Sequence, residues 1–257
     1  MNGGVGELSI EYHIRGRSDG KKIALTFDDG PNPPRTEQIL DILNAAGARA
    51  SFFLIGKWVE RWPRTVERML SAGHVIGNHS HTHAWHMSDY DQAEAAISHV
   101  TGRATMFVRA ASFDYSACAI SPVAQSRLVI DADVNPGDCF LTDPEEVYRG
   151  IVDNPNLGPG SIVDLHDGAE FEDHAQRLGR PLPTILSLPR VIKELERKGF
   201  ELVGLDEFSF PDPLIWRGAR DPRDVVRTGL LGRPGILDHQ GGPLPSEKTV
   251  GGPGAER

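Results

Sequence analysis

Short apolar runs alternate with amphipathic stretches between residue 22 and about residue 205 of the chain. Each run spans four to six residues and contains branched or aromatic side chains, which is typical of buried strands. The pattern predicts seven strands, at Lys22–Phe27, Ala50–Leu54, His74–Gly77, Thr105–Val108, Leu128–Ala132, Ser161–Leu165 and Glu201–Leu205.

The stretches between these runs repeat apolar residues every three or four positions, as amphipathic helices do. Their alternation with the strands predicts an α/β protein with a parallel sheet, open or closed into a barrel, and seven strands favour an irregular barrel. The predicted helices are Thr36–Ala46, one from Pro63 to Ala72, Asp91–Val100, one capped by Asp143 and Thr184–Lys198, with Pro189 interrupting the last helix or marking its first turn.

The regular pattern is confined to the middle of the 257-residue chain, whose length fits one large domain or two small ones. We therefore predict an N-terminal extension over residues 1–20, one domain over residues 21–211 and a C-terminal tail over residues 212–257. From Asp212 the composition shifts to Gly, Pro, Arg and Asp, and residues 233–257 lack periodicity, which predicts a flexible segment.

Composition and charge narrow the classes of partner and compartment. The net charge of −9 argues against nucleic-acid and anionic-membrane partners, and no apolar run is long enough for a membrane span. The Gly-rich, polar N-terminus lacks the apolar segment of a signal peptide, so the chain as it stands is expected in the cytoplasm, with export left open. The two cysteines, Cys118 and Cys139, are expected to be unpaired thiols.

Two adjacent carboxylates, Asp28 and Asp29, follow the first predicted strand and precede a Gly30-Pro31 turn. Their mutual repulsion is unfavourable unless a cation or a shared proton offsets it, although Asp is also common in plain turns. Other polar residues follow further strands, and the carboxyl ends of parallel strands meet at one rim, where such folds carry active sites. These residues are His79, His81, His83, Arg109, Asp131, Asp133, Asp138, His166 and Asp167.

The segment from Asn78 to His83 is the candidate metal site. A helical turn would bring His79 and His83 to one side, and an extended chain would align His81 with them. In either case two imidazoles can reach one cation, and two histidines with one carboxylate form a usual catalytic zinc shell. The competing interpretation is a polar loop with surface histidines, which the nearby pair of carboxylates disfavours. The weaker candidates are His74 and His86.

Two further side chains at this rim suit catalysis. His166 ends a buried strand and can serve as a general acid, because imidazole titrates near neutral pH. A third metal ligand and a structural histidine are the alternatives for His166. Arg109 can orient a carboxylate or bind substrate, or else it forms a rim salt bridge of little energetic value.

These segments resemble the motifs of the polysaccharide deacetylases, carbohydrate esterase family 4, which contain the NodB homology domain. Thr26–Pro31 looks like the first motif of that family, and His79–His83 matches its His-Ser/Thr-x-x-His motif. Its third, fourth and Leu-His motifs are similar to Val108-Arg109, Val134–Asp138 and Ile162–Asp167. The resemblance covers about Lys21 to Phe208 and implies a distorted, incomplete (β/α) barrel of about seven parallel strands.

The resemblance also implies a role for each matching residue. It implies a divalent metal, commonly zinc with cobalt or nickel as alternatives, held by Asp29, His79 and His83. It makes Asp28 the general base. The remaining implied roles are Arg109 holding Asp28, His166 as the general acid, Asp138 tethering His166, and Leu165 lining the pocket for the acetyl methyl group.

Two positions depart from the family pattern. Arg109 is followed by Ala110-Ala111-Ser112 where the family has two prolines and an aromatic residue, whose backbone N–H helps to bind the oxyanion. By this correspondence the N–H of Ser112 is the expected donor. Cys139 stands where the family has Trp. The nearby aromatic residues that could substitute are Phe113, Tyr115 and Phe140.

Taken with the motifs, the resemblance predicts a metal-dependent hydrolase that removes N-acetyl groups from poly- or oligosaccharides containing N-acetylglucosamine, of the chitin-oligosaccharide or peptidoglycan type. Relatives of this fold also hydrolyse acetyl-xylan esters or small cyclic amides, so both substrates are alternatives for the same metal site. A third alternative is a glycan-binding protein with weakened catalysis. A chromogenic acetyl ester, assayed with and without a chelator, separates this last alternative from the enzymes.

Overall fold

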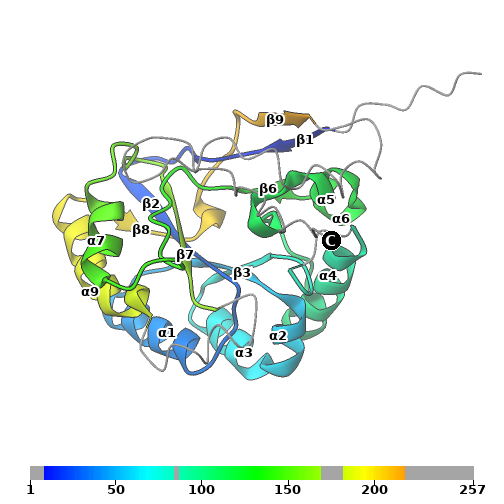
Figure 1. Ribbon diagram of the computed structural model, residues 1–257, viewed down its shortest axis with the longest axis horizontal. Coiled ribbons are helices and arrows are strands. Elements are labelled where there is room, and N and C mark those ends of the chain that lie inside the picture. The colour runs from blue at the N-terminus through cyan, green and yellow to red at the C-terminus, as the bar shows by residue number, and fades with distance from the viewer. Residues whose placement is uncertain (1–8, 84–86, 169–181, 218–257) are drawn as a thin grey trace, which may run out of the picture.

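A sheet of seven parallel strands forms the centre of the molecule (Figure 1). The structure is a computed structural model and describes residues 9–83, 87–168 and 182–217. Six strands lie in the order β6-β5-β4-β3-β2-β7, and β8 pairs with the first residues of β2. The strands are β2 (Lys22–Asp28), β3 (Ser51–Leu54), β4 (Val75–Asn78), β5 (Phe107–Val108), β6 (Leu128–Val129), β7 (Ile162–His166) and β8 (Glu201–Leu202).

This arrangement confirms the predicted α/β fold, an incomplete barrel of seven parallel strands. In the described ranges the outer strands β6 and β7 do not pair with each other. A parallel bridge joins Val134, which follows β6, to Val163 on β7. Strands β5, β6 and β8 are each two residues long, shorter than predicted. In these three segments, only these residues pair with a neighbouring strand before the chain leaves the sheet.

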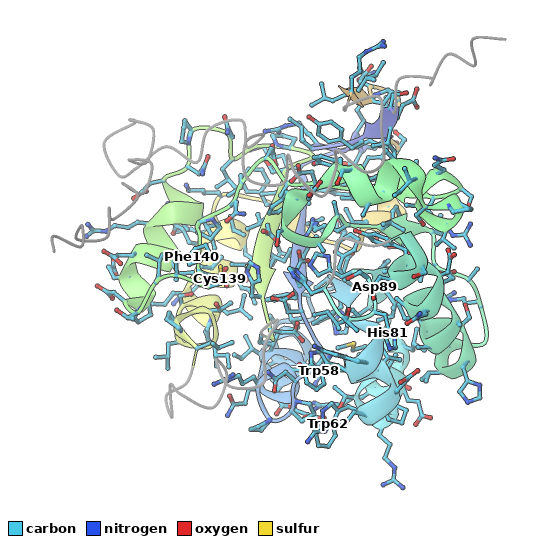
Figure 2. The ribbon with its side chains drawn as sticks, turned by 45° about the vertical axis from the view of Figure 1, so that its right-hand side comes forward. Trp58, Trp62, His81, Asp89, Cys139 and Phe140 are labelled. Carbon is cyan, nitrogen blue, oxygen red and sulfur yellow. The ribbon has the colours of Figure 1, made fainter. Side chains whose placement is uncertain are left out.

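Helices surround the sheet, with α7 and α9 on one side and α4 to α6 on the other (Figure 1). Helices α2, α5 and α6 were not predicted, because six residues or fewer do not establish a periodicity. Trp58 lies on α2, and Trp62 separates α2 from α3 (Figure 2). The helices are α1 (Arg35–Ala46), α2 (Gly56–Arg61), α3 (Pro63–Ser71), α4 (Met87–Thr101), α5 (Tyr115–Ile120), α6 (Pro122–Gln125), α7 (Pro144–Val152) and α9 (Pro183–Arg197), with 3₁₀ turns η1 (Ala111–Phe113) and η2 (Leu205–Glu207).

Two helices differ from the prediction. Helix α4 begins at Met87, before the predicted Asp91, and Pro189 lies inside α9 without interrupting it. Asp143 caps α7 as predicted, since its side chain accepts a hydrogen bond from the backbone N–H of Glu145. Among the described helices, none combines the length and the apolar character needed to cross a bilayer.

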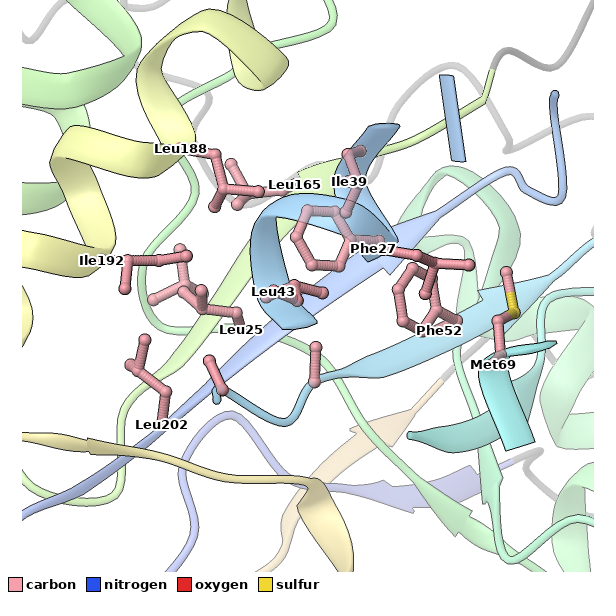
Figure 3. Close-up of a cluster of buried hydrophobic side chains, with 14 of the residues drawn as sticks. Leu25, Phe27, Ile39, Leu43, Phe52, Met69, Leu165, Leu188, Ile192 and Leu202 are labelled. Carbon is pink, nitrogen blue, oxygen red and sulfur yellow. The ribbon is translucent and has the colours of Figure 1, made fainter. Parts of the chain in front are cut away.

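The main hydrophobic core lies between β2 and the helices packed against its face (Figure 3). Leu25 and Phe27 of β2 are fully buried, and the ring of Phe27 stacks on Phe52 of β3 with centroids 5.1 Å apart. Leu43 of α1 and Leu188 of α9 complete the contact. A strand covered on both faces reads as a continuous apolar run, which is why the sequence predicted β2 well.

A two-stranded ribbon lies across one end of the barrel (Figure 1). It pairs β1 (Ser9–Tyr12) antiparallel with β9 (Leu214–Arg217). Neither strand was predicted, because each is a run of four residues in a Gly-rich or Pro-rich context. The segments assigned to the N-terminal extension and to the tail therefore meet in the fold. Residues 233–257, predicted to be flexible, lie outside the described residues.

Candidate metal centre and active site

The sheet register brings the predicted polar residues to one rim. Asp28, the last residue of β2, is paired with His166, the last residue of β7. Asn78 ends β4 beside Val108 of β5, so the histidine segment and Arg109 leave the sheet at the same level. The carboxyl ends of four strands thus converge on one small region.

Asp29, His79 and His83 form a compact trio of buried side chains that could hold a metal ion. Asp29 Oδ1 lies 3.6 Å from Nε2 of His79 and 3.6 Å from Nε2 of His83. The two imidazole rings stand edge to face with their centroids 5.0 Å apart. The structure therefore places side by side the three residues that the resemblance implied as metal ligands.

The backbone between the two histidines is neither the helical turn nor the extended segment considered from the sequence. Ser80 and His83 have left-handed conformations, with φ of 69° and 62°. These bends bring the rings of His79 and His83 to the carboxylate, while His81 packs elsewhere. A Cβ atom on Gly56 would lie 2.4 Å from His81 Nδ1, so His81 fills the space beside the start of α2.

The trio fits a divalent metal. Within the described residues no hydrogen bond reaches the buried Asp29 Oδ1. His79 Nδ1 lies 3.1 Å from the carbonyl oxygen of Arg109, to which it donates, so Nε2 carries the lone pair. Burial lowers the pKa of His79, which favours its neutral, ligating form. Ligands about 2.1 Å from a tetrahedral ion stand about 3.4 Å apart, close to the observed 3.6 Å.

Asp28 lies next to the trio and is held by a buried arginine. Its Oδ1 accepts a hydrogen bond of 2.8 Å from Nη1 of Arg109, and its Oδ2 lies 3.6 Å from His79 Nε2. Burial alone would raise the pKa of Asp28, but Arg109, His79 and His166 hold it below its ordinary value. Asp28 is therefore an ionised carboxylate, and Arg109, with no exposed surface, is not a rim salt bridge.

A second carboxylate at this arginine was missed from the sequence. Asp164 Oδ1 accepts a hydrogen bond of 3.0 Å from Arg109 Nη1, and Asp164 Oδ2 accepts one of 2.8 Å from Asn135. Burial and the charge of Asp28 raise the pKa of Asp164 well above its ordinary value, so the negative charge resides on Asp28. The available signal was an acidic residue inside the otherwise apolar strand β7.

His166 lies on the other side of Asp28. Its Nδ1 is 2.8 Å from Oδ1 of Asp138, whose other oxygen accepts hydrogen bonds from the His166 backbone N–H and from Thr184 Oγ1. Burial lowers the pKa of His166, but Asp138 more than offsets this effect and raises the pKa well above its ordinary value. The imidazole is therefore protonated and suited to donate a proton. Thr184 is a contributor that the sequence did not indicate.

Two further predicted residues, Ser112 and Leu165, follow a strand or lie near its end at this rim. Ser112 is partly exposed, whereas Leu165 is buried. Ser112 is in η1, three residues after Arg109, and has a left-handed φ of 50°. Leu165 is 1% exposed and packs in the main core cluster. Tyr115, considered as an aromatic substitute, is buried and its hydroxyl donates to Asp131. The oxyanion and acetyl-pocket roles of Ser112 and Leu165 stay predictions.

The turn after Asp138 is the exposed side of the site. Cys139 is exposed, and Phe140 exposes 79% of its surface instead of folding over His166 (Figure 2). Cys139 and the buried Cys118 are both unpaired, as predicted. An aromatic residue is therefore present beside the site, but it faces solvent.

The remaining candidates serve the fold in the described structure. His74 is buried, and its Nδ1 accepts a hydrogen bond of 3.2 Å from the backbone N–H of Ala50. Asp133 forms an ion pair with Arg15, and Asp167 accepts a hydrogen bond from Thr36. Burial raises the pKa of Asp167 to about 7. His86 lies outside the described residues.

Comparisons with known proteins place the chain in a family. Residues 15–125 match the family model described as polysaccharide deacetylase. The chain is 32% identical over 195 residues to a chitooligosaccharide deacetylase of Azorhizobium caulinodans, covering 70% of this chain and 90% of that protein. It is 29% identical to a peptidoglycan-N-acetylglucosamine deacetylase of Bacillus cereus, covering 73% of this chain and 87% of that protein.

A solved structure extends the likeness to three dimensions. A family 4 carbohydrate esterase from Streptomyces lividans, determined in complex with acetate, superposes with a TM-score of 0.62 at 25% identity. The match covers 76% of this chain and all of that chain. With a relative at 32% identity over most of its own length, the chain belongs to the polysaccharide deacetylase family, carbohydrate esterase family 4.

Proposed function

We propose that this protein is a metal-dependent hydrolase that removes N-acetyl groups from oligo- or polysaccharides containing N-acetylglucosamine. The observation that carries the proposal is the convergence of three side chains able to hold a metal ion, an ionised carboxylate and a protonated histidine at one rim. The named relatives act on chitooligosaccharide and on peptidoglycan N-acetylglucosamine, which supports the choice of substrate class.

Asp29, His79 and His83 would hold the metal, with zinc as the proposed ion because two imidazoles and one carboxylate suit it. When bound, a divalent metal there would polarise the scissile carbonyl and lower the pKa of a bound water. The buried carbonyl of Arg109 contributes by keeping the proton of His79 on Nδ1.

Asp28 would act as the general base. Arg109 occupies its Oδ1, so its Oδ2, on the side of His79, is the oxygen placed to take a proton from the attacking water. The same ion pair keeps Asp28 ionised and therefore ready to accept. Asp28 would stay close to the metal without ligating it, and Asp164, held neutral, would not compete for the proton.

His166 would act as the general acid, because an amine cannot leave as an anion at neutral pH. Asp138 binds Nδ1 and supports the protonated ring, which leaves Nε2 as the proton donor to the nitrogen. The backbone N–H of Ser112 would stabilise the developing oxyanion, and Leu165 would contact the acetyl methyl group. The N–C bond then breaks, giving acetate and a free amino sugar.

The proposal is tested by product analysis after incubation of the zinc-loaded protein with acetylated chitooligosaccharides, acetyl-xylan and peptidoglycan. We expect acetate and free amino groups from the two N-acetylated substrates, and loss of both products with a chelator or with Asp28→Asn. Release from acetyl-xylan alone would replace the proposed substrate with an O-acetyl ester. Binding of the glycans without any acetate release would favour the glycan-binding alternative.

A further inference from the structure

The segment that carries both histidine ligands is held from outside by the first turn of α4. We call residues 79–83 the ligand loop. Asp89 Oδ2 accepts hydrogen bonds of 2.9 Å from the backbone N–H groups of His81 and Thr82, and Asp89 Oδ1 accepts one of 2.9 Å from Thr82 Oγ1. Asp89 is 6% exposed, and Figure 2 shows it close to His81. The three bonds act on the two residues just before His83.

The other groups of the ligand loop are bound on different sides. The carbonyl oxygens of Ser80 and His81 accept hydrogen bonds of 3.0 Å from the N–H groups of Gly56 and Lys57 in α2. The N–H of Ser80 is bound by Asn78 Oδ1 at 2.9 Å. The loop is therefore suspended between α2, the end of β4 and α4, and Asp89 supplies three hydrogen bonds on the α4 side.

The ligand loop needs such support because two of its five residues are in a left-handed conformation, which L side chains rarely adopt. Without the bonds to Asp89, rotation at His81 and Thr82 would release this conformation and separate the rings of His79 and His83. A metal would then have to bring the ligands together on binding, and that cost appears as weaker affinity.

We propose that Asp89 is a positioning residue for the metal site, one that fixes the ligand loop so that Nε2 of His79 and of His83 face Asp29. The inference rests on the metal-dependent function proposed above. A carboxylate suits this task because its two oxygens accept all three bonds at once. The amide of Asn has one acceptor oxygen and would leave part of the loop unsupported.

A purely structural role for Asp89 gives a different result. A carboxylate in the first turn of a helix also interacts favourably with the helix dipole. If this were its whole contribution, its loss would lower the melting temperature but leave the geometry and affinity of the metal site unchanged. The informative readouts are therefore the dissociation constant for zinc and the absorption spectrum of the cobalt-substituted protein, which reports the coordination geometry.

The test compares Asp89→Asn with Asp91→Asn, a control that removes the same charge from an exposed position of the same helix. Zinc affinity is measured by competition with a chromogenic chelator. We expect Asp89→Asn to bind zinc roughly 10- to 100-fold more weakly, the usual effect of losing a group that supports a ligand, with altered cobalt bands. Asp91→Asn should match the wild type within about twofold in affinity, with an unchanged cobalt spectrum.

Thr82→Val keeps the inference testable if Asp89→Asn fails to fold, because it removes one of the three bonds. We expect a roughly two- to tenfold loss of zinc affinity for it. Equal affinity in wild type and the folded variants would overturn the role of Asp89 and leave the proposed function intact. A wild type that binds no divalent metal would overturn both. Tight metal binding without deacetylation would overturn the proposed function alone.

Discussion

The metal side of the site is buried and densely hydrogen-bonded, whereas the substrate side is more exposed and departs from the family pattern. Asp29, His79 and His83 are all at most 9% exposed, and the ligand loop, which carries the two histidines, is bound by α2, β4 and α4. On the substrate side, Ser112 lies in a left-handed turn and Phe140 projects into solvent.

This contrast separates two kinds of group at the site. Residues that hold a metal and move protons need fixed positions within about half an ångström, so they sit on strand ends with several partners each. Groups that contact a sugar can move or be replaced with a smaller loss of activity. In the proposed function, the groups assigned to hydrolysis match the family motifs, and the departures at Ser112 and Cys139 fall where the substrate would bind.

The largest effect is expected from the proton donor at the border between the two sides. His166→Ala should lower turnover by roughly two to four orders of magnitude, because the leaving amine then receives no proton. Metal content should stay at the wild-type level, since His166 lies outside the trio. Turnover measured beside elemental analysis checks this, and loss of the metal would make His166 a ligand instead.

The next effect concerns the arginine under Asp28. Arg109→Ala should destabilise the fold by about 3–5 kcal/mol, because it leaves Asp28 and Asp164 buried without their common partner. It should also lower kcat much more than it raises KM, since Arg109 contacts the base and not the substrate. Urea unfolding and steady-state kinetics measure both quantities. An increase in KM with kcat preserved would place Arg109 on the substrate.

A smaller effect is expected from acid, through the buried His74, which precedes β4 at the end of that strand away from His79. Burial, with the nearby Arg49 and Arg68, lowers the pKa of His74 to about 4, whereas the unfolded chain titrates near 6.5. The unfolded state therefore binds more protons between these values, so stability is full above about pH 6.5 and falls as pH drops toward 4.

The loss attributable to His74 is at most about 3.5 kcal/mol, since each pKa unit corresponds to about 1.4 kcal/mol. His74→Gln keeps a polar acceptor for Ala50 and removes the titration. The difference in unfolding free energy between about pH 7 and about pH 4.5 should therefore shrink in this variant. An unchanged difference would assign the acid sensitivity to other groups.

The smallest effect is expected on the substrate side. Phe140→Ala should raise KM for an acetylated chitotetraose by about two- to tenfold, the value of one lost aromatic contact. The KM of a small chromogenic acetyl ester should not change. Met106→Ala is the control, because Met106 is similarly exposed but precedes β5. Equal KM values for the tetraose in wild type and Phe140→Ala would remove Phe140 from substrate binding.

The sequence predicted the strands, the rim and the candidate metal ligands, because buried parallel strands and short motifs are local signals. Asp28 and His166 could be placed together because both follow apolar runs that become neighbouring strands. The ribbon of β1 and β9 could not be predicted, since its pairing joins residues far apart in the chain and neither run is periodic.

The groups that support the site were also missed, for a different reason. Asp89, Asp164 and Thr184 act through hydrogen bonds whose partners lie from seven to 55 positions away in sequence. No spacing rule connects such pairs before the fold is known. The left-handed backbone at Ser80 and His83 is equally hidden, because neither residue is glycine.

The central claim is that two adjacent carboxylates divide the work, with Asp29 holding the metal and Asp28 moving the proton. The most direct measurement is metal content by elemental analysis, beside turnover, for Asp28→Asn and Asp29→Asn. We expect Asp28→Asn to keep the metal while turnover falls by roughly two to four orders of magnitude, and Asp29→Asn to lose both, with added metal restoring part of the activity. Loss of metal in Asp28→Asn with retention in Asp29→Asn would contradict the assignment.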